Sequence, residues 1–297
     1  MNHLTYPEAI VVGLLQGVTE LFPVSSLGHS VLLPALIGGR WARDLNVSTP
    51  ESPYLAFVVG LHVATALALV VFFWRDWLRI ITGFVTSVRY RRIQHPDERL
   101  AWMIVLATIP VGVTGLLLEH TFRTVLGRPV PAAIFLTVNG ILLYGAERLR
   151  RRAAAVDVPQ TDPAVASDRR IAADTLGGAT LVGSAQILAL LPGISRSGVT
   201  LGAGLMKGLA HEDAARFSFL LATPVILAAG VLKIPDLFGS LGDGIRGQVL
   251  AGSLASGVAA YLSVRFLTRY FETRTLTPFA VYSVVAGLAS LIWLSVA

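Results

Sequence analysis

Leu21–Ser30 reads LFPVSSLGHS and places a proline, two adjacent serines, a glycine and a histidine inside an otherwise apolar region. QGVTE (Gln16–Glu20) precedes it directly, so a glutamine and a glutamate lie close to the two serines in the sequence. Polar side chains buried among apolar ones cost free energy unless they are paired. Proline and glycine also interrupt helices. The stretch therefore predicts a broken helix whose polar groups face a cavity.

The composition indicates a protein with several membrane spans. Hydrophobic residues make up 54% of the 297 and charged residues only 14%, whereas a soluble domain carries about a quarter charged residues. The net charge of +6 does not indicate nucleic-acid binding, because the basic residues lie in short loops between apolar runs. The absence of cysteine excludes disulfides, thiolate chemistry and cysteine metal sites. The N-terminus lacks the basic region and cleavage site of a signal peptide, so we expect it to be retained.

Six apolar runs are long enough for helices that cross the membrane, since a span needs about 20 mostly apolar residues. They are Tyr54–Trp74, Leu100–Leu118, Val130–Leu149, Ala214–Leu232, Val249–Phe266 and Thr277–Leu294.

Two further apolar regions are each split by a short polar stretch. The first consists of Ala9–Phe22 and Val31–Ile37, with Pro23 between them, and the second of Leu176–Leu191 and Val199–Leu205. Each predicts two half-helices joined by an irregular turn. Such backbone is tolerated in a membrane only where protein buries it or water fills the cavity beside it.

Arginine-rich loops indicate the orientation, because cytoplasmic loops carry an excess of basic residues. The loops that contain Val85–Arg99 and Arg150–Arg170 are expected inside, which places Gly38–Pro53, Glu119–Pro129 and both termini outside.

The same pattern predicts an inverted repeat. One broken hairpin followed by three spans makes up each half, residues 1–149 and 171–297, with 150–170 as a cytoplasmic linker inside one membrane domain, 1–297. Three crossings reverse the side of the membrane, so the second half is inverted relative to the first. The predicted fold is an all-α polytopic membrane protein with six full transmembrane helices and two broken re-entrant hairpins. Paired interruptions of this kind predict a binding site near the middle of the membrane.

The first break holds four candidates for chemistry besides Gln16, which lies on one helical face with Glu20. An intramembrane carboxylate such as Glu20 is functional by default, although it could instead pair with a structural arginine. His29 stands three residues after Ser26, within hydrogen-bonding reach across the turn, whereas the other five histidines are expected to be structural. Ser25 and Ser26 offer a hydroxyl nucleophile, and the alternative is that Ser26 caps the half-helix that follows.

The second break, PGISRSG (Pro192–Gly198), contains Arg196 between Ser195 and Ser197. A guanidinium holds phosphate through two parallel hydrogen bonds and stays charged, and backbone N–H groups at the start of a half-helix add to an anion site. The alternative, an arginine that snorkels from a span end, does not account for the flanking serines and glycines. The two breaks together suit phosphoryl transfer. With no Walker motif and no soluble nucleotide domain, they point to a lipid phosphate or diphosphate.

These stretches resemble the bacterial undecaprenyl-diphosphate phosphatase family, also called bacitracin-resistance proteins. QGVTELFPVSSLGHS is similar to the first family signature, in which Glu or Gln occupies the position of Gln16, and AQILALLPGISRSGVT is similar to the second. VLATIPVGVTGLLLE, HEDAARFSFLLATPVILAAG and LTPFAVYSVVAGL extend the resemblance over nearly the whole chain. The sequence departs from the family at Leu27, where threonine is usual.

The resemblance implies an enzyme of the bacterial cytoplasmic (inner) membrane that removes the terminal phosphate of the C55 isoprenoid diphosphate. Its site would face outward and regenerate the monophosphate carrier for peptidoglycan and other envelope polysaccharides. The resemblance also implies a divalent cation, Mg2+ or Ca2+, and resistance to bacitracin, which sequesters the substrate. The positions that carry over from the family are Gln16, Glu20, Ser25, Ser26, His29, Ser195, Arg196 and Ser197.

We expect Ser26 to be the nucleophile and Arg196 to hold the phosphate, with Glu20 binding the cation or acting on the proton of the nucleophile. His29 would be the general acid or base. The remaining substrate-binding candidates are Gln16, Ser25, Gly193, Ser195 and Ser197.

Two alternatives are left open. A metal-activated water could replace Ser26 as the attacking group, and the protein could be a transporter or flippase for a polyprenyl phosphate, because broken helices in inverted repeats are typical of transporters. The expected partners are a polyprenyl diphosphate and membrane lipids, with no nucleic acid, and a homodimer is left open.

Overall fold

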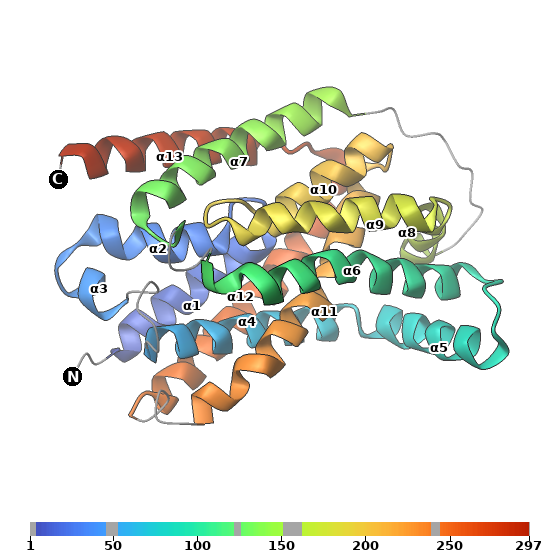
Figure 1. Ribbon diagram of the computed structural model, residues 1–297, viewed down its shortest axis with the longest axis horizontal. Coiled ribbons are helices and arrows are strands. Elements are labelled where there is room, and N and C mark those ends of the chain that lie inside the picture. Colours follow the sequence, from blue (N-terminus) through green and yellow to red (C-terminus); the bar gives the residue numbers. More distant parts are fainter. Residues whose placement is uncertain (1–3, 46–52, 122–125, 151–161, 239–243, 297) are drawn as a thin grey trace.

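The computed structural model describes residues 4–45, 53–121, 126–150, 162–238 and 244–296, and every regular element within these ranges is helical (Figure 1). The elements in chain order are α1 (Tyr6–Leu21), α2 (Ser26–Ile37), α3 (Gly39–Asp44), α4 (Pro53–Phe72), α5 (Trp74–Tyr90), α6 (Pro96–Thr121), α7 (Pro129–Leu149), α8 (Pro163–Ala172), α9 (Leu176–Ser184), the 3-10 helix η2 (Ala185–Leu190), α10 (Arg196–Lys207), α11 (His211–Phe238), α12 (Arg246–Thr273) and α13 (Thr277–Val296).

Five of the described helices are long and apolar enough to cross a membrane, namely α6, α7, α11, α12 and α13. A sixth span results if α4 and α5, which are bent by 85° at their junction, are counted together. Outward-facing side chains on these helices are apolar and exposed, for example Leu117 at 75% and Ile292 at 67%, as a surface that contacts lipid requires. The chain is therefore a helical multi-pass membrane protein.

Both predicted helix breaks are present. Phe22, the residue before Pro23, has extended backbone, because the proline ring disfavours helical backbone at the preceding position, and α1 ends at Leu21. In the second half, α9 tightens into η2 and the chain leaves it at Leu191 with extended backbone. In each case a new helix, α2 or α10, starts within a few residues.

The two broken hairpins match in detail at a constant spacing along the chain. Thr5 and Thr175 cap α1 and α9, and Ser25 and Ser195 cap α2 and α10, so that corresponding caps are 170 positions apart (175 minus 5 and 195 minus 25). The helices that follow, α2 and α10, are both 12 residues long. The agreement concerns the hydrogen-bonding roles of the capping residues and the lengths of the helices that follow them.

Glycines allow α1 to approach α12 closely. A Cβ on Gly13 would lie 2.3 Å from the carbonyl oxygen of Gly252, and one on Gly17 would lie 2.2 Å from that of Ser256. Small residues at a membrane helix interface bring backbones together in this way. Gln16, which lies between the two glycines, is thereby brought within reach of α12.

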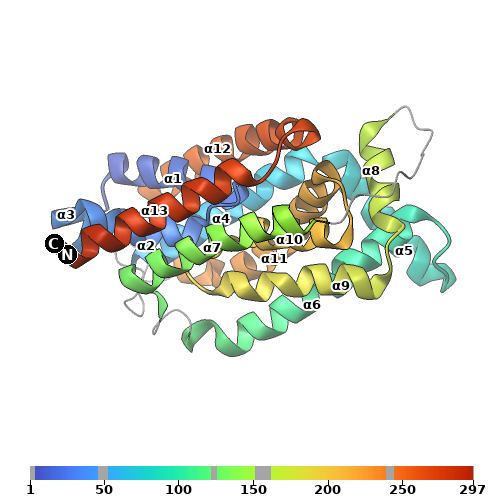
Figure 2. The same cartoon turned by 90° about the horizontal axis from the view of Figure 1, so that it is seen from above.

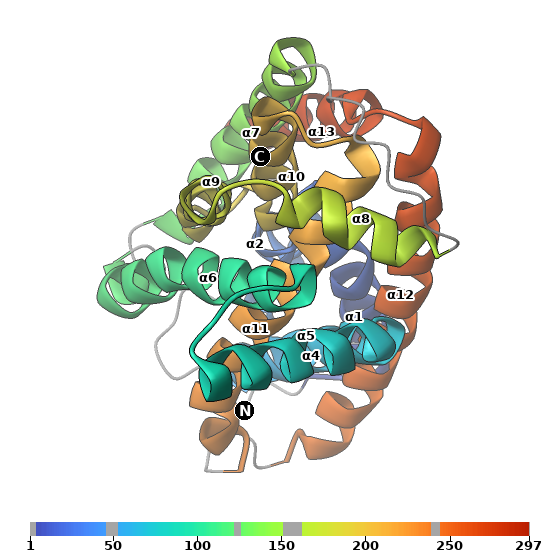
Figure 3. The same ribbon diagram turned by 90° about the vertical axis from the view of Figure 1, so that its right-hand side faces the viewer.

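One end of the bundle carries α5 and α8, which lie across the long helices (Figures 2 and 3). Buried ion pairs fix both to α11. Arg216 donates to Asp168 at 2.7 and 2.9 Å, Arg79 donates to the same carboxylate at 2.7 Å, and Asp76 accepts from both arginines. Burial of charge is tolerated when it is paired in this manner.

The predicted linker, residues 150–170, is only partly described, since 151–161 lie outside the described residues. From Pro163 onward the chain forms α8 and is not an extended connection. Asp168 explains why this part folds, because its carboxylate is buried against two arginines from other helices. The hydrogen bond from Arg170 to Asp213 adds a further contact and raises the pKa of the Arg170 guanidinium.

Candidate functional site

The two helix breaks are in direct contact. A Cβ on Gly28 would lie 2.9 Å from the Cα atom of Gly193, whose φ of 113° is one that side-chain-bearing residues rarely adopt. Asn139 of α7, which is fully buried, bridges the breaks. Its Nδ2 donates to the carbonyl oxygen of Pro23 at 3.1 Å, and its Oδ1 accepts from the backbone N–H of Ser195 at 2.9 Å. The two halves of the chain thus meet at their irregular turns.

Glu20, at the end of α1, is the centre of the polar cluster at this contact. Its side chain is only 6% exposed, and its Oε1 accepts a hydrogen bond from Nη2 of Arg196 at 2.5 Å. Its Oε2 accepts a hydrogen bond from the hydroxyl of Ser26, and Nε2 of His62 lies 3.2 Å from the same oxygen. The predicted carboxylate, arginine and serine are therefore brought together from the two breaks.

Ser25 and Ser26 have different roles. The hydroxyl that caps α2 belongs to Ser25, which accepts from the amide of Gly28 at 3.2 Å. The reading of Ser26 as that cap is therefore wrong, and its hydroxyl is directed at Glu20 instead. Ser25 has a φ of 68°, a conformation in which a side-chain-bearing residue is strained. A strained turn thus presents the Ser26 hydroxyl to the carboxylate.

Gln16 supports Glu20 from one helical turn away. Its Nε2 faces Oε2 of Glu20 at 3.4 Å, and its Oε1 accepts hydrogen bonds from the hydroxyls of Thr65 at 2.9 Å and Ser256 at 2.5 Å. An ionised carboxylate only accepts, so the N–H end of the amide must face Glu20, and its oxygen then faces the two hydroxyls. In this arrangement Gln16 acts on Glu20, and the prediction that it contacts the substrate stays a prediction.

His29 faces away from this cluster. Its Nδ1 lies 2.7 Å from the carbonyl oxygen of Ser25, and its Nε2 lies 2.8 Å from the hydroxyl of Tyr282 on α13. Because a carbonyl only accepts, Nδ1 carries a proton, and in the neutral ring Nε2 then accepts from Tyr282. Of the two ring hydrogen bonds described for His29, one returns to the Ser25 carbonyl and the other reaches Tyr282 on α13, and neither involves Ser26.

In the second break, Arg196 has one guanidinium nitrogen to spare. Nη2 is held by Glu20, whereas Nη1 is buried and has no hydrogen-bond partner among the residues that the structure describes. A buried donor without a partner is costly, and a phosphate oxygen would satisfy it. The hydroxyls of Ser195 and Ser197 lie 3.1 Å apart. Ser195 caps α10 through the Gly198 amide, and Ser197 donates to the carbonyl oxygen of Phe22 at 3.4 Å.

Several polar residues of the cluster were not predicted from the sequence. His62, expected to be structural, contacts Glu20, and α4, α7, α12 and α13 each contribute a hydrogen-bonding side chain. His62 and Thr65 are three apart on an apolar helix and so share a face, a signal that was available. The others stand alone in apolar runs, and only the folded chain brings them to the breaks. The additional residues are His62, Thr65, Asn139, Ser256 and Tyr282.

The donor set limits how a divalent cation would be held. Among the residues described, no three or more His, Asp or Glu side chains are arranged to hold a metal ion. Mg2+ in phosphate sites is commonly held by one or two carboxylates together with substrate oxygens and water. Glu20 is the carboxylate of this cluster, and its oxygens already accept hydrogen bonds from Arg196 and Ser26, so a cation would bind it only where those bonds open.

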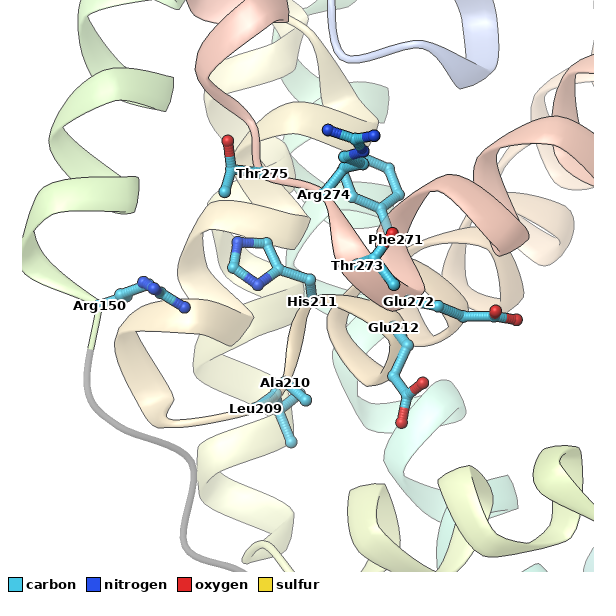
Figure 4. A pocket seen from close by; sticks show the side chains of 10 residues that line it. All are labelled: Arg150, Leu209, Ala210, His211, Glu212, Phe271, Glu272, Thr273, Arg274 and Thr275. Carbon is cyan, nitrogen blue, oxygen red and sulfur yellow. The ribbon is translucent and has the colours of Figure 1, made fainter.

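A surface pocket of about 380 Å³ lies elsewhere, at the ends of α7 and α12 and the start of α11 (Figure 4). It is lined by charged side chains that include Arg150, His211 and Arg274. Next to it, Nε2 of His211 lies 2.9 Å from Glu147, which also accepts from the backbone N–H of Leu276. None of the residues of the two breaks lines this pocket, so the polar cluster at the breaks is the better candidate site.

Comparison with known proteins identifies the family of the chain. A family model described as "Bacitracin resistance protein BacA" matches residues 9–289. The chain is 69% identical to "Undecaprenyl-diphosphatase" of Mycolicibacterium paratuberculosis, with 99% of this chain and 98% of the relative covered. It is 52% identical to "Undecaprenyl-diphosphatase 1" of Frankia casuarinae, with 97% of this chain and 97% of the relative covered. It is 43% identical to "Undecaprenyl-diphosphatase" of Granulibacter bethesdensis, with 97% of this chain and 96% of the relative covered. The chain belongs to the bacitracin resistance protein BacA family.

Proposed function

We propose that the protein hydrolyses undecaprenyl diphosphate to undecaprenyl phosphate and inorganic phosphate. The observation that carries the proposal is the contact of Glu20 with both Ser26 and Arg196 where the two helix breaks meet. A hydroxyl bonded to a carboxylate, beside a guanidinium with a spare donor, is a nucleophile next to an anion-binding group. The names of the relatives agree with this substrate.

In the proposed mechanism, Nη1 of Arg196 binds an oxygen of the terminal phosphate. The Ser26 oxygen attacks the terminal phosphorus while its proton passes to Glu20. The bond from this phosphorus to the bridging oxygen breaks, and its electron pair leaves with undecaprenyl phosphate. Water then attacks the phosphoserine, and the bond from phosphorus to the Ser26 oxygen breaks as protonated Glu20 returns its proton to that oxygen. Glu20, now ionised, accepts the proton that the attacking water loses and passes it to solvent as inorganic phosphate is released.

Glu20 takes the role of base in this scheme because it touches the Ser26 hydroxyl. His29 and Tyr282 are connected to each other at a partly exposed position instead, and we assign them to the approach of the substrate. A divalent cation held by Glu20 and the diphosphate would neutralise negative charge on the substrate.

Ser26→Ala separates this mechanism from attack by an activated water. If Ser26 is the nucleophile, the variant should lose turnover while it still binds substrate through Arg196, and the wild-type enzyme should yield a phosphoserine on rapid quenching. Inversion at a chiral terminal phosphorus would instead count for a single displacement by water, because two displacements restore the configuration. Turnover that persists in Ser26→Ala and is abolished by a chelator would also support attack by water rather than by Ser26.

We further propose an inverted-repeat topology in the bacterial cytoplasmic membrane. The matched caps 170 positions apart support two equivalent hairpins, and the start of α1 and the end of α13 lie at the same end of the bundle (Figure 1). We assign the arginine-rich end with α5 and α8 to the cytoplasm, and we propose that the site opens to the opposite, outer side. Reporter fusions at Arg92 and Pro163 should behave as cytoplasmic, and an external signal at either position would overturn the topology.

Transport of a lipid phosphate is the alternative. A transporter needs Arg196 to bind the phosphate but has little use for a carboxylate bonded to a serine hydroxyl, which favours hydrolysis. The deciding experiment is phosphate release from undecaprenyl diphosphate by the purified protein, with and without a chelator. Release that the chelator abolishes supports the enzyme and its cation, whereas binding without release supports the transporter.

A further inference from the structure

The helix α5 turns sharply away from the helix that precedes it. The bend between Phe57–Phe72 and Trp74–Tyr90 is 85°. Seen from the end of the bundle, α5 extends across the lower half of the view, in front of α4 (Figure 3). If α4 crosses the membrane, a helix at nearly a right angle to it lies close to the membrane plane.

One face of α5 is fixed to the protein. Asp76 and Arg79 belong to the buried ion-pair network with Asp168, while Ile80 and Ser87 are buried. These positions recur at helical spacing and form the inner stripe of α5. The inner face is therefore held by both charge and packing, and α5 cannot roll freely about its axis.

The opposite face of α5 is apolar and uncovered. Its side chains are spaced alternately by four and three residues, which places them on one stripe. All are more than half exposed: Trp74 52%, Leu78 58%, Ile81 55%, Val85 56% and Val88 51%. An apolar stripe of this length on the edge of a membrane protein needs an apolar neighbour.

Charge next to this stripe favours an anionic lipid leaflet over another protein. Arg75 lies over the Trp74 ring at 5.2 Å and Arg89 over the Tyr90 ring at 5.8 Å, one pair at each end of the helix. Both arginines flank the apolar stripe on the same side. Interfacial helices combine an apolar face with arginine and aromatic residues in this way.

We propose that α5 lies in the plane of the membrane, with its apolar stripe in the acyl boundary and Arg75 and Arg89 against anionic lipid headgroups. The helix would hold the broken α4–α5 unit at a fixed depth, and with it the buried network that fixes α8 and α11. The cytoplasmic side of this contact rests on the proposed topology. The in-plane placement needs only that α4 crosses the membrane, whichever end faces the cytoplasm, and does not depend on the proposed chemistry.

Depth measurements test the placement. The chain has no cysteine, so Leu78→Cys, Ile81→Cys, Val85→Cys and Val88→Cys each give one site for a fluorophore in proteoliposomes with shallow or deep lipid quenchers. An in-plane helix predicts the same shallow depth at all four sites. A spanning helix predicts depths that change by about 15 Å over the ten residues from 78 to 88. Labels at Val281 and Leu288 of α13 are the matched control and should differ in depth.

Lipid charge is tested at the Ile81 site. Brominated phosphatidylglycerol should quench there about five- to thirtyfold more than brominated phosphatidylcholine at the same mole fraction, from an attraction of about 1 kcal/mol for each of one or two basic residues. Arg75→Gln with Arg89→Gln should abolish the difference, while Arg265→Gln with Arg269→Gln on α12, which removes the same charge elsewhere, should keep it. Unequal depths along α5, absence of lipid quenching, or equal quenching by the two lipids in the wild-type chain would each overturn the proposal.

Discussion

Replacing Arg196 by lysine asks whether the spare guanidinium nitrogen serves a phosphate. Lysine keeps a positive charge opposite Glu20 but has no second nitrogen to occupy the position of Nη1, which is buried and unpaired in the described part of the chain. Removal of one donor to a transition-state oxyanion costs about 2–4 kcal/mol. At 1.36 kcal/mol for each factor of ten, kcat/KM should fall about 30- to 900-fold.

The assay is phosphate release from undecaprenyl diphosphate by purified variants of matched thermal stability. Arg196→Ala should lose more than Arg196→Lys, because it also leaves the buried carboxylate of Glu20 without the guanidinium. Lys207→Met removes a positive charge at the far end of the same helix and should change turnover by less than about twofold, as expected for a partly exposed, weakly paired charge. A value of kcat/KM for Arg196→Lys within threefold of wild type would refute the assignment of Nη1 to the phosphate.

Three further substitutions test the residues that support the site, and a fourth, Gln186→Leu, is the matched control. Gln16→Leu should lower turnover at least about tenfold, because the amide that faces Glu20 is lost. Gln186, 170 positions later, is buried, and neither polar atom of its side chain has a partner in the described structure. Gln186→Leu should therefore keep turnover and raise the melting temperature. Equal losses in both would contradict the assigned roles. Asn139→Ala should lower both the melting temperature and turnover, because it leaves buried backbone groups of both breaks unpaired. The expected loss in the free energy of unfolding is about 1–3 kcal/mol. An unchanged melting temperature would count against the bridge. Tyr282→Phe keeps the ring and loses the hydrogen bond to His29, so turnover should fall less than about tenfold, and a loss above about a hundredfold would place this pair in the chemistry.

Much of the fold could be predicted because membrane spans leave a strong signal in sequence. Length and hydropathy located the five described helices that are long enough to cross a membrane, and Pro23 with the PGISRSG motif located both breaks. The sixth predicted span, Tyr54–Trp74, corresponds to α4, which counts as a span only together with α5. The bend after α4 was not predicted, because the arginines of α5 indicated a charged cytoplasmic loop. The apolar residues between those arginines, which form one stripe on a helix, were not considered. The α8 helix was missed for a different reason. Its burial depends on Asp168 meeting arginines that are distant in sequence.

The candidate site was also predicted in part: some of its residues could be found from the sequence and others could not. Glu20, Ser26 and Arg196 could be found because polar residues at helix breaks in an apolar chain are conspicuous, and the structure brings them together. Local spacing suggested that His29 acts with Ser26, but the ring is turned toward Tyr282 on α13. His62 reaches Glu20 from another helix. Partners of this kind are set by helix packing, which the sequence of one segment does not contain.

The most direct measurement of the central claim is the rate of phosphate release from undecaprenyl diphosphate by Glu20→Gln beside the wild-type protein. Glutamine keeps the size of the side chain but removes the charge that pairs with Arg196 and the base that accepts the Ser26 proton. If hydrolysis depends on this cluster, the wild-type protein releases phosphate and the folded variant is slower by at least about a hundredfold, the lower range for loss of a general base. Turnover by Glu20→Gln within a few fold of wild type would contradict the account.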